Sequence, residues 1–180
     1  MVKKIMLSSL ANGIEGVTKG FGGYMMECAG YSFMQQNHVS GVRLKVKTDK
    51  QDQIFEVYWN TMMSSTLKKT TADSQRTVEF GAMGLAILLT LKLTKYKCFE
   101  TSSKGSGIDF WLYEEESDDL DFSKGARLEV SGIMKETKVN TVKKRVGVKK
   151  KQSTKSQGSN KVAYISVSEF GTPKSAYETA

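Results

Sequence analysis

The stretch from Asp73 to Leu93 carries the pattern that most restricts how this chain can fold. Apolar residues recur there at every third or fourth position, and these are Val78, Ala82, Leu85, Leu89 and Leu93. This spacing is the period of one buried helix face. Asp73 or Ser74 can cap the first turn with a side-chain oxygen. We therefore expect a long central helix.

Gly81 and Gly84 lie inside this predicted helix. A glycine in a helix interior costs about 1 kcal/mol relative to alanine, so the helix either tolerates that cost or uses the missing side chains. The second explanation predicts that another backbone packs closely against this face.

Strands are predicted after the central helix, in runs that cover 96–102, 108–114, 126–133 and 162–170. A turn at 103–107 and an acidic connection at 115–124 join the first three of them. Between the third and fourth runs, three valines at helical spacing predict a basic helix over 135–152. From residue 73 onward the order is helix, strand, strand, strand, helix, strand. We expect an α/β (α+β) fold with a mixed central sheet flanked by helices.

The first 72 residues precede this order and predict a helix over 20–37 and a hairpin of 42–46 with 54–59. The Ser/Thr-rich segment 60–71 predicts a loop or a weak helix. A chain of 180 residues fits one domain. We interpret residues 1–72 as a helix-and-hairpin extension of a core that covers 73–172.

Composition bounds the partners and the compartment. The formal charge is +8 and the sequence pI about 9.4, which favours partners that carry phosphate. The longest apolar segment, 80–93, is shorter than the ~20 residues of a membrane span, and the apolar start of the chain is too short for a signal peptide. Cys28, Cys98 and His38 lack the spacing of a zinc site. We expect a cytoplasmic protein with reduced core thiols and no membrane partner.

Three acidic residues fall at positions that matter for chemistry. Asp109 lies in the second predicted strand of the core, Glu129 in the third and Glu79 in the central helix. Neighbouring strands are about 4.8 Å apart, so Asp109 and Glu129 can converge on one divalent cation, for which magnesium is suited. The alternative is that they are ordinary strand acids, paired in salt bridges or facing solvent.

The order of elements, with Gly107-Ile108-Asp109 and Arg127-Leu128-Glu129-Val130-Ser131, resembles the PD-(D/E)XK nuclease superfamily and its restriction-endonuclease-like core. The resemblance covers about residues 73–170. It implies that Asp109 and Glu129 bind Mg²⁺ or Mn²⁺ and that Glu79 joins them. It also implies hydrolysis of DNA.

One position departs from the pattern of that superfamily: Ser131 stands where its catalytic lysine would be. The apolar stripe of the predicted helix 135–152, continued beyond Val146, reaches Lys149 and Lys150, either of which can point toward the sheet. Gln152 lies close by and can hold a water or a phosphate. The alternative is that these lysines are solvated or bind phosphate without a role in catalysis.

The same helix carries the densest positive charge in the chain. Its cationic residues besides Lys149 and Lys150 are Lys143, Lys144, Arg145, Lys151 and Lys155. We expect Lys143, Lys144, Arg145 and Lys151 to contact nucleic acid, the alternative being a solvated helix face. Trp59, Trp111 and Tyr113 can stack on bases or, as strand residues usually do, pack within the fold.

Three functions remain open. The first is a magnesium-dependent phosphodiesterase that acts on DNA. The second, favoured by Ser131, is a catalytically inactive nuclease-like fold that binds nucleic acid or a protein. The third is a subunit of a larger defence or repair assembly, in which the first 72 residues form an interface with another copy or with a partner protein.

Overall fold

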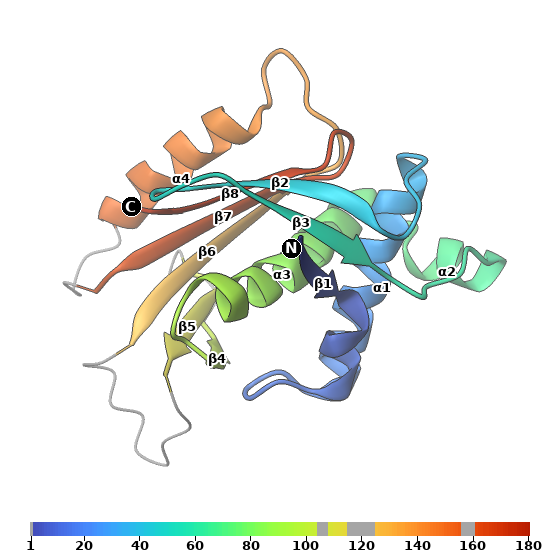
Figure 1. Cartoon of the computed structure of the whole chain (residues 1–180), viewed down its shortest axis with the longest axis horizontal. Helices are drawn as coiled ribbons and strands as arrows, with labels where there is room; N and C mark the ends of the chain where they lie inside the picture. The colour runs from blue at the N-terminus through green and yellow to red at the C-terminus, as the bar shows by residue number, and fades with distance from the viewer. Residues whose placement is uncertain (1, 104–107, 115–124, 156–160) are drawn as a thin grey trace.

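The structure is a mixed α/β fold built on one eight-stranded mixed sheet (Figure 1). This computed structural model describes residues 2–103, 108–114, 125–155 and 161–180. The strands lie in the order β1-β3-β2-β8-β7-β6-β5-β4. Their bounds are β1 Lys3–Met6, β2 Val42–Thr48, β3 Gln53–Tyr58, β4 Cys98–Thr101, β5 Phe110–Tyr113, β6 Ala126–Ile133, β7 Ala163–Glu169 and β8 Lys174–Thr179. The turn expected at 103–107 lies mostly outside the described residues, and the acidic connection expected at 115–124 lies wholly outside them.

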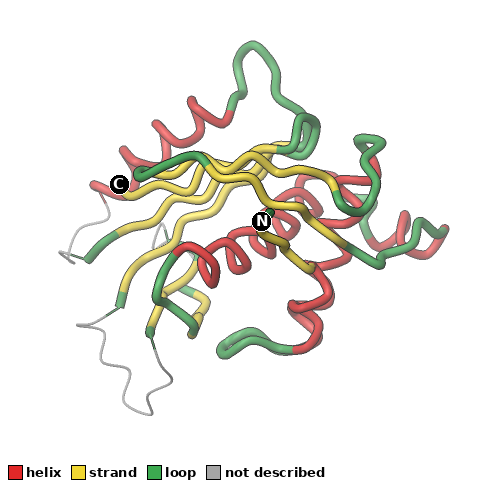
Figure 2. Tube along the Cα trace, viewed as in Figure 1, coloured by secondary structure: helices red, strands yellow, loops and turns green. Residues whose placement is uncertain are grey.

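Helices cover both faces of the sheet (Figures 1 and 2). They are the 3₁₀ helix Leu7–Asn12, α1 Lys19–Gln35, α2 Ser65–Thr70, α3 Ser74–Leu93 and α4 Val142–Lys155. α1 and α3 pack together under one face, where the larger core contains inward side chains of most strands. α4 lies on the other face, over β6, β7 and β8, with a smaller core of its own. No helix within the described ranges has the length and apolar character needed to cross a membrane.

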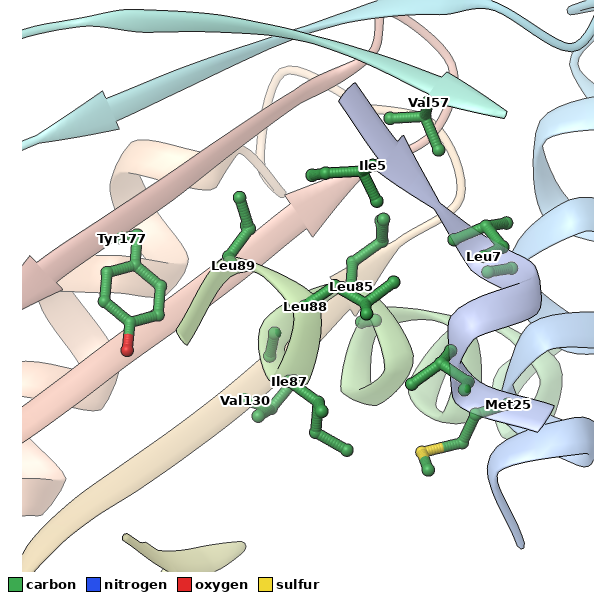
Figure 3. Close-up of a cluster of buried hydrophobic side chains, with 14 of the residues drawn as sticks. Ile5, Leu7, Met25, Val57, Leu85, Ile87, Leu88, Leu89, Val130 and Tyr177 are labelled. Carbon is green, nitrogen blue, oxygen red and sulfur yellow. The ribbon is translucent and has the colours of Figure 1, made fainter. Parts of the chain in front are cut away.

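α3 forms the centre of the larger core, as its apolar period predicted. The Asp73 side chain accepts a hydrogen bond from the backbone N–H of Arg76 at 3.1 Å and so caps the helix. Figure 3 shows the middle of α3 surrounded by side chains from distant parts of the chain; the labelled residues are Ile5, Leu7, Met25, Val57, Leu85, Ile87, Leu88, Leu89, Val130 and Tyr177. A Cβ on Gly81 would lie 3.1 Å from the backbone nitrogen of Ala29 in α1. The predicted close backbone approach is confirmed.

A second glycine lets α3 rest directly on the sheet. Gly132 lies near the end of β6, and a Cβ there would come within 2.4 Å of the Val78 carbonyl oxygen and 2.5 Å of the Val78 Cγ1. A Cβ atom in a protein essentially never lies this close to a non-bonded atom, so only glycine permits this packing. The residue after Val78 is Glu79, so the contact also sets how far that residue lies from β6.

The first 72 residues belong to the same sheet as the rest of the chain. The predicted hairpin is confirmed, with β2 antiparallel to β3. β2 also pairs in parallel with β8, and β1 pairs in parallel with β3. The predicted extension and the predicted core therefore share one continuous sheet, to which the hairpin contributes two of the eight strands. The sequence analysis missed β1 and β8 because both are short; β1 begins with two lysines, and β8 contains Lys174, Ser175 and Thr179.

The helix predicted over 135–152 begins later than expected. α4 starts at Val142, whose backbone N–H donates to the Glu136 carboxylate at 2.7 Å. Residues 136–141 form a bend, and Val139 in it is 79% exposed. Val142 and Val146 pack on the sheet as their spacing predicted. The helical prediction for 135–141 was wrong because Val139 shares the period of the other valines but contacts no core.

Candidate active site

A cleft of about 940 Å³ opens where β6 passes between α3 and α4. β5 begins at Phe110, which pairs with Leu128, so the later part of β6 extends beyond β5 and borders the cleft. The predicted site residues in its lining are Glu79, Asp109, Ser131, Arg145, Lys149 and Gln152. These residues lie up to 73 positions apart in the chain, and the fold brings them to one place.

Asp109 is fixed to β6 by its backbone and by its side chain. Its N–H donates to the Leu128 carbonyl at 3.1 Å, and its Oδ2 accepts from the Val130 N–H at 2.6 Å. The residue between these two partners is Glu129. Asp109 precedes β5 by one residue, whereas the sequence placed it inside the strand. Burial raises the pKa of Asp109, opposed by the Val130 N–H and by Lys149, and the negative charge of Glu79 adds to the rise.

Glu129 lies in the middle of β6 and is only 1% exposed. Among the described residues, none donates a hydrogen bond to either of its carboxylate oxygens, and Lys149 is its ionic neighbour. Burial is the main cause that raises its pKa, the nearby charge of Asp109 adds to the rise, and Lys149 opposes it. A buried carboxylate without hydrogen bonds is costly to the fold unless a cation offsets its charge. The surroundings of Glu129 are therefore suited to a cation.

Lys149 reaches the two acids from α4. Its Nζ lies 3.6 Å from Glu129 Oε2, and 24% of its side chain is exposed. Lys150 points to the other flank of α4, where its Nζ lies 3.0 Å from Glu178 Oε2. Successive helix residues are rotated by about 100°, so these neighbours cannot both face the cleft. Of the two candidate lysines, the fold brings Lys149 to the acids and places Lys150 away from them.

Glu79 and Gln152 complete the walls of the cleft. Glu79 is exposed on α3, and its Oε1 accepts a hydrogen bond from Gln75 Nε2 at 3.1 Å. Gln152 is exposed on α4, three residues after Lys149. Both side chains can reach a ligand in the cleft without first being uncovered.

Ser131 and Arg145 form a contact that the sequence did not predict. Arg145 Nη1 donates to Ser131 Oγ at 3.0 Å, and Arg145 Nε donates to Asn140 Oδ1 at 2.9 Å. A guanidinium therefore lies against the position where the resembled superfamily has its lysine. Asn140 was missed altogether, because a polar residue in a loop carries no periodic signal.

Asp109 and Glu129 fit a hard divalent cation as a pair. Across the described part of the chain, no group of three or more His, Cys, Asp or Glu side chains is arranged to hold a metal. Mg²⁺ does not require such a group, because it is commonly bound by one or two carboxylates together with waters and substrate phosphates. The unpartnered oxygens of Glu129 are donors of the kind that Mg²⁺ or Mn²⁺ prefers.

The remaining candidates divide between surface and core. Lys143, Lys144 and Lys151 are exposed on α4, whereas the side chain of Lys155 lies outside the described residues. Trp59 is stacked on Phe33 in the core, with ring centroids 5.2 Å apart. Tyr113 is buried and donates to Glu100. Packing thus accounts for Trp59 and Tyr113, while Trp111 lies beneath the Lys161 ammonium, 5.2 Å from its ring centroid.

His38 and the cysteines lie apart from the cleft. His38 Nε2 is 3.0 Å from the Gly171 carbonyl oxygen and ties the end of α1 to the β7–β8 turn. Cys28 is buried in α1, and burial raises the pKa of its thiol to about 11. Cys98 is likewise a thiol, partly exposed in β4. Both cysteines are thiols, as expected.

A scan against protein-family models, a search of curated proteins and a search of solved structures each return no match for this chain. The functional interpretation therefore depends on the geometry of the cleft.

Proposed function

We propose that this protein is a metal-dependent nuclease that hydrolyses phosphodiester bonds in DNA with Mg²⁺ or Mn²⁺. The observation that carries the proposal is Glu129, a buried carboxylate whose two oxygens accept no hydrogen bond from the part of the chain that the structure describes. Asp109 and Lys149 lie close enough to Glu129 to shift its pKa in opposite directions. Asp109 and Lys149 line the open cleft and Glu129 is buried beside them. An acid pair and a lysine are groups that metal-assisted hydrolysis uses.

The arrangement of strands supports the proposal. β4, β5 and β6 form an antiparallel meander, and β7 is parallel to β6 and reached through α4. In the superfamily that the sequence resembles, the acids lie on the second and third strands of such a core. Asp109 at the start of β5 and Glu129 within β6 correspond to those positions. We propose a restriction-endonuclease-like core for residues 73–172 on these grounds.

The chain's own residues suggest a division of tasks. Asp109 and Glu129 would hold the cation, which, when bound, supplies positive charge that polarises the scissile phosphate and makes a nearby water more acidic. Lys149 Nζ can orient the attacking water or donate to a phosphate oxygen. Gln152 can donate to the same phosphate, and Glu79 can accept a hydrogen bond from a water at the rim. In the hydrolysis, the water oxygen would bond to phosphorus and release its proton to solvent, while the P–O ester bond breaks and the leaving oxygen takes a proton from solvent.

Lys149 can replace the lysine that is missing at position 131. It reaches the acids from the following helix, and its Nζ lies 3.6 Å from Glu129 Oε2. A lysine that compensates buried carboxylates before substrate arrives can donate to substrate once a metal takes over that compensation. We therefore propose that Lys149 of α4 takes the role that a lysine on β6 has in that superfamily.

The test is incubation of the purified protein with plasmid and single-stranded DNA, with Mg²⁺ or Mn²⁺ against a chelator. Asp109→Asn removes one charge of the acid pair, and Lys150→Ala is the matched control, because Lys150 faces the other flank of α4. We expect cleavage that requires the metal, is lost in Asp109→Asn and persists in Lys150→Ala. Cleavage by Asp109→Asn at the wild-type rate, or no cleavage by folded wild type, would overturn the proposal.

A second candidate is a catalytically inactive nuclease-like fold that binds nucleic acid. The observation that favours it is the ion pair of Lys149 with Glu129, which compensates the buried charge without a metal. This candidate predicts that the protein binds DNA in the presence of chelator and leaves it intact when Mg²⁺ or Mn²⁺ is added. The cleavage assay therefore separates the two candidates.

A further inference from the structure

We infer that Arg145, held by Ser131 and Asn140, forms a second phosphate-binding subsite in the cleft. Its ligand is the phosphate next to the scissile one on a nucleic-acid strand. The inference rests on the proposed nuclease function for the identity of the scissile phosphate. It adds to that function a residue that determines how the strand lies in the cleft.

Arg145 is oriented by two uncharged partners. Its Nε donates to Asn140 Oδ1 at 2.9 Å and its Nη1 donates to Ser131 Oγ at 3.0 Å. A guanidinium has five N–H donors, so three remain after these two bonds. Over the described ranges, no carboxylate lies within ion-pair distance of Arg145. The geometry thus presents an oriented, uncompensated positive charge with spare donors to the cleft.

The spacing of Arg145 and Lys149 suits successive phosphates. The two residues are one turn apart on α4, which corresponds to about 6 Å along the helix axis, and both line the same cleft. Phosphates along one strand are separated by a similar distance. With Lys149 beside Asp109 and Glu129, the phosphate at Lys149 is the reacting one and the phosphate at Arg145 is its neighbour.

The subsite explains why serine suits position 131. A lysine there would place a second positive charge against the Arg145 guanidinium and repel it. The Ser131 hydroxyl instead accepts a hydrogen bond from Arg145 Nη1. Serine in place of lysine at position 131 therefore allows Arg145 to be held in the cleft.

The test measures binding separately from cleavage. The probe is a fluorescein-labelled deoxythymidine decamer, and its affinity is followed by fluorescence anisotropy in chelator, where no metal-dependent turnover occurs. The variants are Arg145→Gln, Arg145→Lys and Ser131→Ala. Lys68→Gln is the matched control, because it removes the same charge from exposed α2.

We expect Arg145→Gln to weaken binding about tenfold, since hydrogen bonds to a charged partner are lost. Arg145→Lys and Ser131→Ala should each weaken DNA binding about threefold. The first replaces the planar guanidinium with an ammonium, and the second removes a hydrogen bond that orients the guanidinium. Lys68→Gln should stay within about twofold of wild type. An Arg145→Gln affinity equal to that of Lys68→Gln would overturn the subsite.

A second arm locates the phosphate. Substrates carrying one neutral methylphosphonate at a time are cleaved by wild type and by Arg145→Gln. Wild type should lose about tenfold in kcat/KM at one linkage adjacent to the scissile one, and Arg145→Gln should be insensitive at that linkage. Equal sensitivity of both proteins at every linkage would overturn the assignment. If wild type cleaves no substrate while the binding loss of Arg145→Gln is present, the nuclease proposal fails and the phosphate contact stands.

Discussion

Glu129 and Glu169 are two glutamates on adjacent strands, each 1% exposed, with opposite surroundings. The Glu169 carboxylate accepts from the backbone N–H groups of Glu136, Gly171 and Thr172, at distances from 2.8 to 3.3 Å. The Glu129 carboxylate accepts none within the described ranges and has Lys149 as its ionic neighbour at 3.6 Å. Equal burial therefore hides a difference in hydrogen bonding.

The difference separates an acid that the fold uses as a hydrogen-bond acceptor from one that we propose binds a cation. Glu169 satisfies N–H groups at the turn between β7 and β8 and at the start of the bend before α4, so its charge is used by the fold. Glu129 accepts no backbone N–H from the described residues and has its charge offset by Lys149 at 3.6 Å, so a cation bound there can take over that compensation. A buried carboxylate without donors is the better marker of a functional site.

The largest expected effect is on stability, with the same substitution made at both positions. Glu169→Gln should lower the free energy of unfolding by about 3 kcal/mol, because charge-assisted bonds to three N–H groups are weakened. Glu129→Gln should leave it unchanged or higher at neutral pH, since a buried charge is removed. Urea unfolding at pH 7 measures both. Similar losses in the two variants would erase the distinction.

The next effect is on cleavage. Glu129→Gln should lower the rate at least about 100-fold, because a ligand to the metal is lost. Glu178→Gln is the control, since Glu178 pairs with Lys150 and Lys47 on the other flank of α4, and it should stay within about twofold. The rates come from a metal-dependent plasmid assay. An active Glu129→Gln would count against this residue as a ligand.

A smaller effect distinguishes the neighbouring lysines. Lys149→Met should reduce cleavage about 10- to 100-fold, whereas Lys150→Met should change it less than twofold. Lys149→Met should also raise the pKa of Glu129 further, because the charge that opposes the rise is lost. Parallel rate measurements at saturating Mg²⁺ test the pair. Equal losses would show that charge on α4 as a whole, and not the position of Lys149, matters.

The smallest effect concerns pH. Because burial raises the pKa of Glu129, the folded protein holds a proton there at pH values where the unfolded chain has released it. The free energy of unfolding of wild type therefore falls as pH rises through the raised pKa, relative to Glu129→Gln. We expect the two stability curves to converge below the usual range for glutamate and to separate above the raised value. Unfolding from pH 4 to 8 checks this, and a constant difference would contradict it.

The strands and helices that carry the acids could be predicted because their buried faces require apolar residues at regular spacing in the sequence. Val78 and its successors fixed α3, and the apolar neighbours of Glu129 fixed β6. β1 and β8 were missed because few of their residues are apolar and the strands are short. Their position in the sheet depends on partners far away in the chain, which periodicity does not encode.

The candidate site was predictable residue by residue only in part. Asp109 and Glu129 follow from the order of strands, but Lys149 and Lys150 both continue the stripe of Val146, so the sequence left them undecided. The choice depends on where α4 lies relative to β6. The Arg145–Ser131 contact and the unpartnered state of Glu129 depend on interatomic distances, so no spacing rule could have found them.

Because Gly132 has no side chain, it determines how closely two walls of the cleft approach each other. α3 carries Glu79 and β6 carries Ser131, and the two elements meet where a single methyl group would strike Val78. The separation of the two walls is therefore fixed by a residue that lines the cleft and has no side chain. A Gly132→Ala substitution would leave every charged side chain of the protein unchanged and would alter the width of the cleft. The lack of a side chain at Gly132 would thus determine the size of the ion or strand that the cleft admits.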